Sequence, residues 1–263
     1  MTILEELAQY ARYRVEADKK KIAPDIMKVM ALEMGSPIRG DFAFEETLRR
    51  EGLSFICECK KASPSKGVIE PDFRYLDIAR DYERAGADCI SVLTEPKWFL
   101  GSDRYLQEIA DAVAVPCIRK DFTVDEYQIY QAKVLGASAV LLICSILSEK
   151  QLEDFLSVCQ TLGLSALVEV HDASEAKMAV EAGARIVGVN NRNLKDFTVD
   201  TENSRKLRDL IPDNVLFVSE SGVKDEGDIA KIRQMGADAV LIGEALMRAA
   251  DKKEMLNRLR GVS

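Results

Sequence analysis

A short phrase, Gly-Ala followed by a polar residue, occurs four times in the chain. It stands at Gly86-Ala87-Asp88, Gly136-Ala137-Ser138, Gly183-Ala184-Arg185 and Gly236-Ala237-Asp238, about 50 residues apart, a period typical of a repeated structural unit. Each phrase follows a helical pattern and precedes a short apolar run. A glycine with positive φ would close each helix before the chain turns into a strand. The phrase therefore predicts helices that alternate with strands.

Short apolar runs alternate with longer amphipathic stretches from Ser54 onward. Eight such runs begin near Phe55, Cys89, Val115, Ala139, Ala166, Ile186, Val215 and Ala239. Strands that alternate with helices pair in parallel, and eight units in about 210 residues favour an α/β fold of one closed (β/α)8 TIM barrel. The alternative, a doubly wound sheet, would need a glycine-rich dinucleotide turn after its first strand. The run Lys61–Gly67 has no such turn.

The residues before the first strand have a different pattern. A charged amphipathic helix is expected from Ile3 to about Lys21, followed by a break at Ala23-Pro24 and further helix through Met34. We expect one domain, in which residues 1–50 form an N-terminal helical extension packed on the barrel and residues 51–263 form the barrel. The extension either caps one end of the barrel or is a solvated lid without functional contact, and the sequence favours neither.

Composition excludes several classes of function. The chain carries 36 Lys+Arg against 44 Asp+Glu, a net charge of -8, so its overall field would not attract a nucleic acid. The N-terminus lacks the basic and apolar segments of a secretory signal, and the longest apolar run, Ala137–Leu147, is shorter than the roughly 20 residues of a membrane helix. We therefore expect a cytoplasmic protein that does not contact a membrane.

Cysteine and histidine usage limits the chemistry further. The six cysteines lie mostly inside apolar runs rather than in metal-binding pairs, which predicts buried, reduced thiols. His171 is the one histidine, so a two-histidine metal site is excluded and we expect no metal. Acid–base chemistry would then depend on Lys, Asp and Glu.

The first expected strand ends in two charged residues that share one face. In the run Phe55–Lys60, a period of two places Ile56, Glu58 and Lys60 together, and the apolar alternates, which include Cys57 and Cys59, face the helices. Barrel interiors normally hold bulky aliphatic side chains, so an inward charge needs a reason. We expect Glu58 and Lys60 to point inward at the carboxyl-terminal mouth.

Four other strands end in the same way, with Lys120, Glu169, Asn190 and Glu220. For any one of these residues, a structural ion bridge is as reasonable as catalysis. Two lysines and three carboxylates that converge at the carboxyl-terminal face favour an active site, because barrel enzymes assemble their sites there.

Small residues after the last two strands predict an anion site. The runs Ser221-Gly222-Val223 and Gly243-Glu244-Ala245 stand at loop-to-helix transitions, where free backbone amides bind phosphate. One such glycine could serve only as a turn, but two at neighbouring strands are more specific. Ser63, in the loop after the first strand, could add a hydroxyl.

These features together predict a small phosphorylated substrate with a second anionic group near Lys60 or Lys120. Sugar-phosphate isomerisation, aldol cleavage and ring closure by dehydration all fit a cationic acid and a carboxylate base without a cofactor. The residues alone leave these reaction classes open.

Six strings of the sequence resemble the motifs of one enzyme family, in order. They are FICECKKASPSKG at Phe55–Gly67, IRKDF at Ile118–Phe122, LVEVH at Leu167–His171, NNRNL at Asn190–Leu194, SESG at Ser219–Gly222 and LIGEALMR at Leu241–Arg248. The chain resembles indole-3-glycerol phosphate synthase over the whole barrel, and its first helix resembles the family's extension more loosely. The resemblance implies a lyase of tryptophan biosynthesis that needs no cofactor. Its substrate, 1-(2-carboxyphenylamino)-1-deoxyribulose 5-phosphate, undergoes ring closure with loss of carbon dioxide and water.

The resemblance also implies roles for the residues that match the motifs. Lys120 would protonate the ketone oxygen of the substrate, Glu169 would be the base in the dehydration, and Lys60 would hold the substrate carboxylate and pair with Glu58. Glu58, Asn190 and Glu220 would orient hydroxyls and the lysines. The phosphate would bind at Ser63, Ser221, Gly222, Gly243 and the Glu244 amide.

Two positions depart from this pattern. Glu244 places a carboxylate beside the phosphate site, where some family members have serine, so its side chain is expected to turn away. His171 follows Glu169 by two residues, and a hydrogen-bonding role at the strand end is favoured over a role as base.

Three other interpretations remain. The chain could be phosphoribosylanthranilate isomerase, although that family's Cys and Asp pair is not matched by the outward Cys57 and Cys59. It could be a Schiff-base aldolase that uses Lys120, or a barrel that binds a sugar phosphate without catalysis. An association with other enzymes of the tryptophan pathway is also open.

Overall fold

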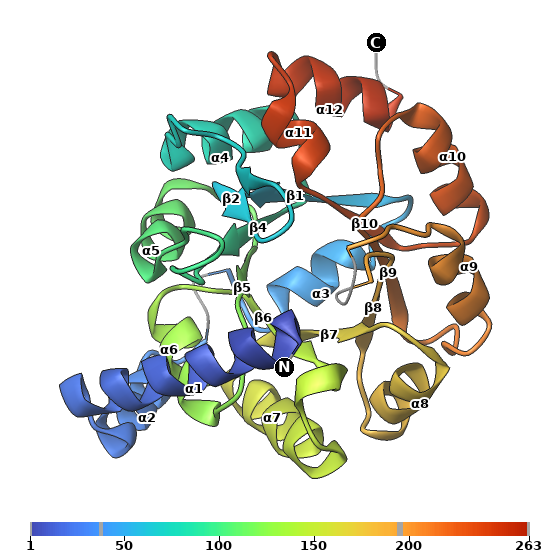
Figure 1. Ribbon diagram of the computed structural model, residues 1–263. Helices are drawn as coiled ribbons and strands as arrows, with labels where there is room; N and C mark the ends of the chain where they lie inside the picture. The colour runs from blue at the N-terminus through green and yellow to red at the C-terminus, as the bar shows by residue number, and fades with distance from the viewer. Residues whose placement is uncertain (1, 37–38, 194–196, 262–263) are drawn as a thin grey trace.

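Parallel strands close into a barrel in the computed structural model, which describes residues 2–36, 39–193 and 197–261 (Figure 1). Within these residues the barrel has eight strands, in the order β1-β10-β9-β8-β7-β6-β5-β4. They are β1 (Ser54–Cys59), β4 (Cys89–Leu93), β5 (Cys117–Lys120), β6 (Ala139–Ile143), β7 (Ser165–Val170), β8 (Ile186–Asn190), β9 (Leu216–Glu220) and β10 (Ala239–Ile242). Leu194, which ends one of the sequence strings above, and the chain ends at residues 1 and 263 lie outside the described residues.

Helices cover the outside of this barrel. They are α4 (Tyr75–Arg84), α5 (Asp103–Ala112), α6 (Glu126–Val134), α7 (Glu149–Leu162), α8 (Ala173–Glu181), α9 (Glu202–Arg208), α10 (Glu226–Gln234), α11 (Glu244–Arg248) and α12 (Lys252–Arg260), with a 3-10 turn, η1 (Cys144–Ile146), after β6. Figure 1 shows them as a ring around the strands. The predicted (β/α)8 barrel is confirmed.

The predicted strand starts agree with the structure to within two residues. The largest difference is at β5, which begins at Cys117 rather than near Val115, because Pro116 has no amide to donate to a neighbouring strand. The sequence did not predict the short antiparallel pair β2 (Ala62–Ser63) and β3 (Gly67–Val68), which projects from the loop after β1.

The repeated glycines have the predicted backbone conformation. Gly86, Gly136, Gly183 and Gly236 have φ of 88°, 82°, 85° and 70°, a region that a residue with a Cβ rarely adopts. Each glycine follows a helix and precedes an even-numbered strand of the barrel, so the repeat marks the helix-to-strand turns.

Two hydrophobic layers confirm the alternation of side chains along β1. Phe55, Cys57 and Cys59 belong to the outer layer, between strands and helices, whereas Ile56 belongs to the inner layer. The six cysteines are buried free thiols. Burial raises the pKa of the Cys117 thiol to about 12, which keeps it protonated and unreactive.

In residues 2–36 and 39–53, three helices precede β1. They are α1 (Ile3–Lys21), whose bounds match the prediction, α2 (Pro24–Glu33) and α3 (Ala43–Leu48), which the sequence did not predict. Thr2 and Glu5 form a capping box at the start of α1.

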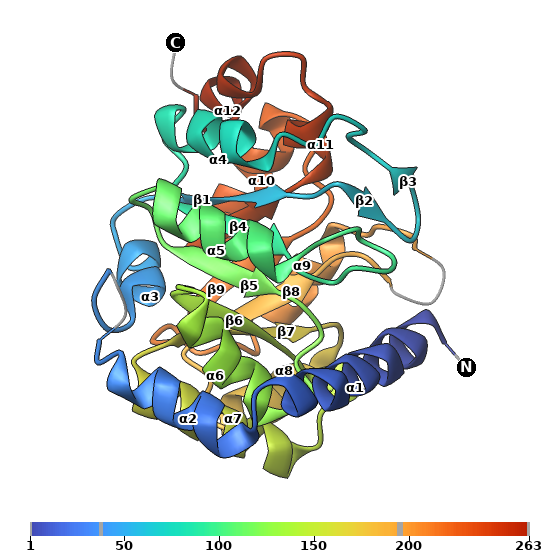
Figure 2. The ribbon, with the colours of Figure 1, turned by 90° about the vertical axis from the view of Figure 1, so that its left-hand side faces the viewer.

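The extension contacts both ends of the barrel. Phe44 and Leu48 of α3 pack with the first residues of several strands, and the Glu45 amide donates to Ser165 Oγ at the start of β7. Leu7 of α1 packs in the same inner layer. Figure 2 shows α3 on the side where the strands begin and the N-terminal end of α1 where they end. None of the helices in the described ranges has the length and apolar character that crossing a membrane requires.

Candidate functional site

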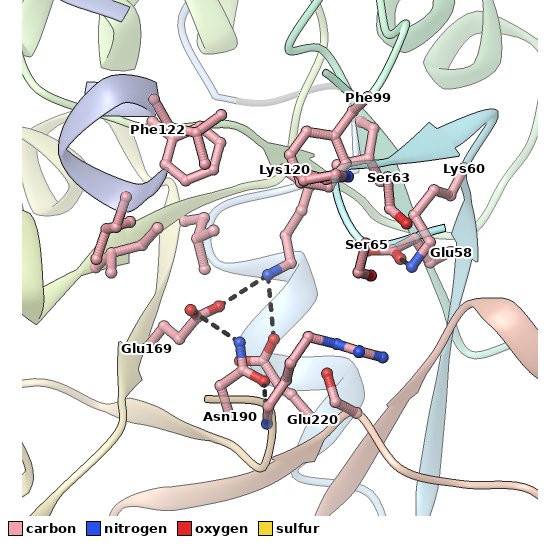
Figure 3. Close-up of a pocket in the computed structure, with 18 of the residues that line it drawn as sticks. Glu58, Lys60, Ser63, Ser65, Phe99, Lys120, Phe122, Glu169, Asn190 and Glu220 are labelled. Atoms are coloured by element: carbon pink, nitrogen blue, oxygen red, sulfur yellow. Dashed lines mark hydrogen bonds and ion pairs between the residues drawn. The ribbon is translucent and has the colours of Figure 1, made fainter. Parts of the chain in front are cut away.

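A cavity of about 910 Å³ opens at the carboxyl ends of the strands, and we call it the main cavity. Most of the predicted site residues line it, in part as shown in Figure 3. They are Glu58, Lys60, Ser63, Lys120, Glu169, Asn190, Glu220, Ser221 and Glu244. The structure therefore brings together, at one mouth, residues that lie almost 190 positions apart in the chain.

The end of β1 supplies an ion pair to this cavity. Lys60 Nζ lies 2.6 Å from Glu58 Oε1, and Ser91 Oγ on the neighbouring strand β4 donates to Glu58 Oε2 at 3.4 Å. Glu58 is 4% exposed, so these contacts take the place of the water that its side chain loses on burial. The predicted pairing of Lys60 with Glu58 is confirmed.

Lys120 lies at the centre of the charged cluster. Its Nζ atom is 2.9 Å from Glu169 Oε2 and 3.1 Å from Glu220 Oε2 (Figure 3). Burial lowers the pKa of Lys120, but the charges of Glu169 and Glu220 outweigh burial, and the net direction is upward. The sequence left this balance open, and the structure shows that Lys120 is held as an ammonium.

Glu169 is held ionised between polar partners. Burial acts to raise the pKa of this carboxyl, but the charge of Lys120 and contact with His171 overcome burial and hold the pKa below its usual range. Asn190 Nδ2 donates to Glu169 Oε1 at 3.1 Å. A carboxylate fixed at both oxygens is oriented well for proton abstraction.

The pKa of Glu220 is shifted in the opposite direction to that of Glu169. Burial raises its pKa to about 7, the charge of Lys120 opposes this, and the charge of Glu169 adds to it. Among the described atoms, Glu220 Oε1 is one of the few buried side-chain oxygens without a hydrogen-bond partner. Two neighbouring buried carboxyls are therefore pushed apart in pKa, which is the arrangement that separates acid from base in many active sites.

A glycine on β8 makes room for Glu220. A Cβ atom at Gly188 would lie 2.1 Å from Glu220 Oε1 and 3.0 Å from Leu167 Cδ1. The sequence analysis missed Gly188. A glycine inside a strand of a packed barrel was the signal that could have revealed it, because a strand glycine often marks a close approach.

A second cavity adjoins the main one and is lined by the predicted anion-binding turns. Ser221, Gly222, Gly243 and Glu244 line it. Ser221 and Gly222 both have positive φ, 66° and 101°, which is unusual for serine. Gly243 stands at the N-cap of α11, whose first amides have no partner within the helix.

Gly243 also lies against the ion pair of β1. A Cβ atom there would be 2.5 Å from Glu58 Oε1 and 2.8 Å from Lys60 Nζ. Ser63 lines the main cavity but not the second one. The second cavity is lined by Ser65 and Lys66 of the same loop.

The expectation that the Glu244 side chain turns away from the anion site stays a prediction. Glu244 lines both cavities. Its Oε1 atom is 3.1 Å from Arg248 Nε, one turn along α11, and 3.7 Å from Lys66 Nζ. These two cations offset the carboxylate, which explains how it remains beside an anion site.

One wall of the main cavity is apolar, which the sequence analysis did not predict. It is formed by Leu93, Phe99, Phe122, Leu141 and Ile143. Phe99 is placed by a loop in which the buried Glu95 carboxylate accepts from the amides of Lys97, Trp98 and Phe99 at 2.7–2.9 Å. Arg192 also lines the cavity. An aromatic group fits such a wall.

The first helix takes part in the site. Ile3, Leu4 and Leu7 line the main cavity, and Arg14 Nη1 donates to Asp121 Oδ2 at 3.1 Å, beside Lys120. Of the two interpretations of the extension, a solvated lid without functional contact is therefore wrong.

The fold and site define a class: a (β/α)8-barrel enzyme with a cluster of lysines and carboxyls at the carboxyl face and glycine turns after its last two strands. The family model described as indole-3-glycerol phosphate synthase matches residues 4–259. The chain belongs to that family and is a carbon–carbon lyase.

Two relatives are similar over nearly their whole length. A protein named indole-3-glycerol phosphate synthase from Ruminiclostridium cellulolyticum is 52% identical over 259 residues, which cover 98% of this chain and 99% of the relative. One of the same name from Lachnoclostridium phytofermentans is 48% identical over 269 residues, 99% of each chain.

Solved structures with low sequence identity share the fold. A 3-hexulose-6-phosphate synthase has a TM-score of 0.65 at 16% identity, over 80% of this chain and 100% of that one. A structure described as KGPDC from Streptococcus mutans has a TM-score of 0.63 at 11% identity, over 80% and 96%. These likenesses concern the barrel alone.

Proposed function

We propose that the chain closes the pyrrole ring of 1-(2-carboxyphenylamino)-1-deoxyribulose 5-phosphate, with loss of carbon dioxide and water, to give indole-3-glycerol phosphate. The observation that carries this proposal is the position of the Lys120 ammonium, between two buried carboxylates and beside the Lys60–Glu58 pair. Membership of the family supports the same reaction.

The shape and charge of the two cavities suit this substrate. Its aromatic ring packs against Phe99 and Phe122, and its carboxylate binds Lys60. Its phosphate binds in the second cavity. The groups assigned to the phosphate are Ser221, Gly222, Gly243 and the Glu244 amide, together with the Ser63 hydroxyl.

Lys120 acts as the general acid in ring closure. The aromatic carbon attacks the ketone, and the ketone oxygen takes the proton of Lys120 as its negative charge develops. The raised pKa of Lys120 does not prevent this transfer, because an alkoxide is far more basic than the ketone from which it forms. Loss of carbon dioxide then restores the aromatic ring.

Glu169 acts as the base in the dehydration. It removes the proton that must leave with the hydroxyl, and Asn190 and Lys120 hold its two oxygens in place. Glu58 and Glu220 orient the lysines, and Lys60 keeps the carboxylate of the substrate in position until carbon dioxide leaves.

The wider organisation follows from this function. We propose that residues 51–263 are the catalytic barrel and residues 1–50 an extension packed on it, in which α1 covers one side of the mouth. The enzyme works in the cytoplasm on a small phosphorylated molecule, without nucleic acid or membrane. Association with other enzymes of the tryptophan pathway is compatible with it.

A fluorescence assay for the indole product tests the function. The full chain is mixed with the anilino-ribulose phosphate, and Lys120→Met serves as the matched control. We expect product with the native chain and almost none with the variant. Borohydride treatment with substrate tests for an imine on Lys120, and a trapped adduct would favour the aldolase. Failure of the native chain to support growth of a tryptophan auxotroph would refute the proposal.

A further inference from the structure

The one histidine of the chain lies directly behind the proposed base. His171 follows β7 by one residue, and its Nε2 atom is 3.3 Å from Glu169 Oε1, an ion-pair distance without hydrogen-bond geometry. The same oxygen accepts from Asn190 Nδ2. Glu169 Oε2 is the oxygen held by Lys120. The carboxylate therefore has one cation on each of its oxygens, and only Lys120 lines the main cavity.

His171 itself lines a different cavity. This outer cavity lies between the start of α1, η1 and the loops after β7 and β8, and Asn190 and Arg192 line both it and the main cavity. The His171 side chain is 17% exposed. The imidazole thus stands behind the site and does not line the main cavity.

A second carboxylate fixes the other side of the ring. Glu175 on α8 lies 3.1 Å from His171 Nδ1 through its Oε2 atom, and this atom also accepts from the His171 amide at 2.8 Å. Ser145 Oγ is 3.2 Å from Nδ1 and donates to Glu175 Oε1. Asn203 Nδ2 on α9 donates to the His171 carbonyl at 3.1 Å.

The groups around the ring favour a positive charge on it. Desolvation lowers the pKa of His171, but contacts with Glu169 and Glu175 outweigh it and raise the pKa to about 10. The other charged groups that line the outer cavity are Glu5, Asp172, Arg192 and Asp200. Three of these four are acidic, so the surroundings support an imidazolium over the physiological range.

The proposed reaction removes the charge of one of the two cations beside Glu169. When Lys120 gives its proton to the ketone oxygen, it becomes neutral and no longer stabilises the Glu169 carboxylate. A buried carboxyl without a cation is driven toward its protonated form, which cannot act as a base. We propose that His171 is a positioning residue that fixes Glu169 Oε1 from behind, so that the carboxylate keeps a cationic partner after Lys120 has lost its proton. This inference rests on the proposed function, in which Lys120 is the acid and Glu169 the base.

The first test observes the imidazole directly in the full-length chain. Because the chain has one histidine, ring nitrogen NMR of a histidine-labelled sample needs no assignment. We expect the ring to remain protonated through neutral pH, and its midpoint to fall by about one unit or more in Glu175→Gln, as loss of one adjacent carboxylate requires. A native midpoint near the ordinary histidine value would overturn the proposal.

The second test compares pH profiles of kcat. His171→Gln keeps a polar side chain at this position but removes the charge, and Lys177→Ala removes an exposed lysine of the same helix as Glu175. We expect the acid limb of the kcat–pH profile to move to higher pH in His171→Gln. The kcat at low pH should fall about tenfold for each pH unit of this shift, with little loss of kcat at high pH. The KM should change little, and Lys177→Ala should match the native profile.

Two results would count against a positioning role in that experiment. An equal loss of kcat at every pH would indicate a structural role for His171, and a rise in KM without change in kcat would indicate substrate binding. No product from the native chain at any pH would refute the proposed function and with it the role of His171. NMR reports the protonation of the imidazole even when the enzyme does not turn over. A failure of the proposed function is therefore distinguishable from a failure of the His171 proposal alone.

Discussion

Replacing Lys120 with methionine removes one ammonium and leaves two buried carboxylates facing each other. Glu169 and Glu220 are each 2% exposed, and Lys120 contacts both within 3.1 Å. Loss of one partner of a buried ion pair costs about 3–5 kcal/mol, because the remaining charge is unsolvated. We expect Lys120→Met to lower the free energy of unfolding by about 3 kcal/mol at pH 8.

This loss should depend on pH, with a definite sign. In the native chain the pKa of Glu169 lies below its unfolded value, so its ion pair stabilises the fold above that value and is lost as the pH falls. Burial already raises the pKa of Glu220 to about 7 in the native chain. In the variant, loss of the Lys120 charge raises the pKa of both carboxyls. A raised carboxyl contributes stability at low pH and loses it as the pH rises. The difference between the two proteins should therefore widen from about pH 5 to about pH 8, by about 1.4 kcal/mol for each unit of pKa shift.

Urea denaturation at several pH values measures this difference. The double variant Lys120→Met/Glu169→Gln is the matched control, because it removes the repulsion as well as the cation. It should recover part of the stability at pH 8. A stability difference that is the same at pH 5 and pH 8 would refute the electrostatic reasoning. In activity assays Lys120→Met should lose about 10²–10⁴ in kcat, as expected for a general acid, with phosphate affinity largely retained.

Three further substitutions test other parts of the site. Glu169→Gln should slow the dehydration in single-turnover kinetics, and an effect on ring closure instead would contradict its role as base. Gly243→Val should mainly raise the Michaelis constant, because its side chain would meet the Lys60–Glu58 pair beside the phosphate site, and an unchanged constant would argue against that site. Gly188→Ala should displace the Glu220 carboxyl, which it would approach to 2.1 Å, and lower kcat; native kcat would show that the position of Glu220 is unimportant.

Local and periodic features could be predicted from the sequence. The period of two along β1 was enough to place Glu58 and Lys60 inside, and the repeated glycines were enough to mark the turns. Lys120, Glu169 and Glu220 could be expected to meet because strand ends of one closed barrel meet at one rim. In each case the signal lies within a few residues or follows from closure of the barrel.

Features that depend on non-local packing could not be predicted in this way. The short helix α3 has no long amphipathic pattern, and its two buried hydrophobic residues, Phe44 and Leu48, have a packing role only when the starts of the strands surround them. The Phe99 wall depends on Glu95, whose carboxylate folds back onto amides two to four residues ahead. The ion pair of Glu244 with Lys66 could not be predicted, because Lys66 lies far away in sequence.

The interactions within the charged cluster are strengthened by the burial of its side chains. A charge pair interacts much more strongly in a medium of low polarity than in water, so the effect of Lys120 on Glu169 depends on what lies beneath them. Ile56 and Leu167 form part of the inner layer below the cluster, and Phe44 of α3 seals the amino end of that layer. Since α1 covers one side of the mouth and α3 closes the floor, residues that precede the first strand contribute to the electrostatics of the site from both ends. The extension thus contacts the main cavity and the floor beneath it, although none of the predicted acid–base residues lies on it.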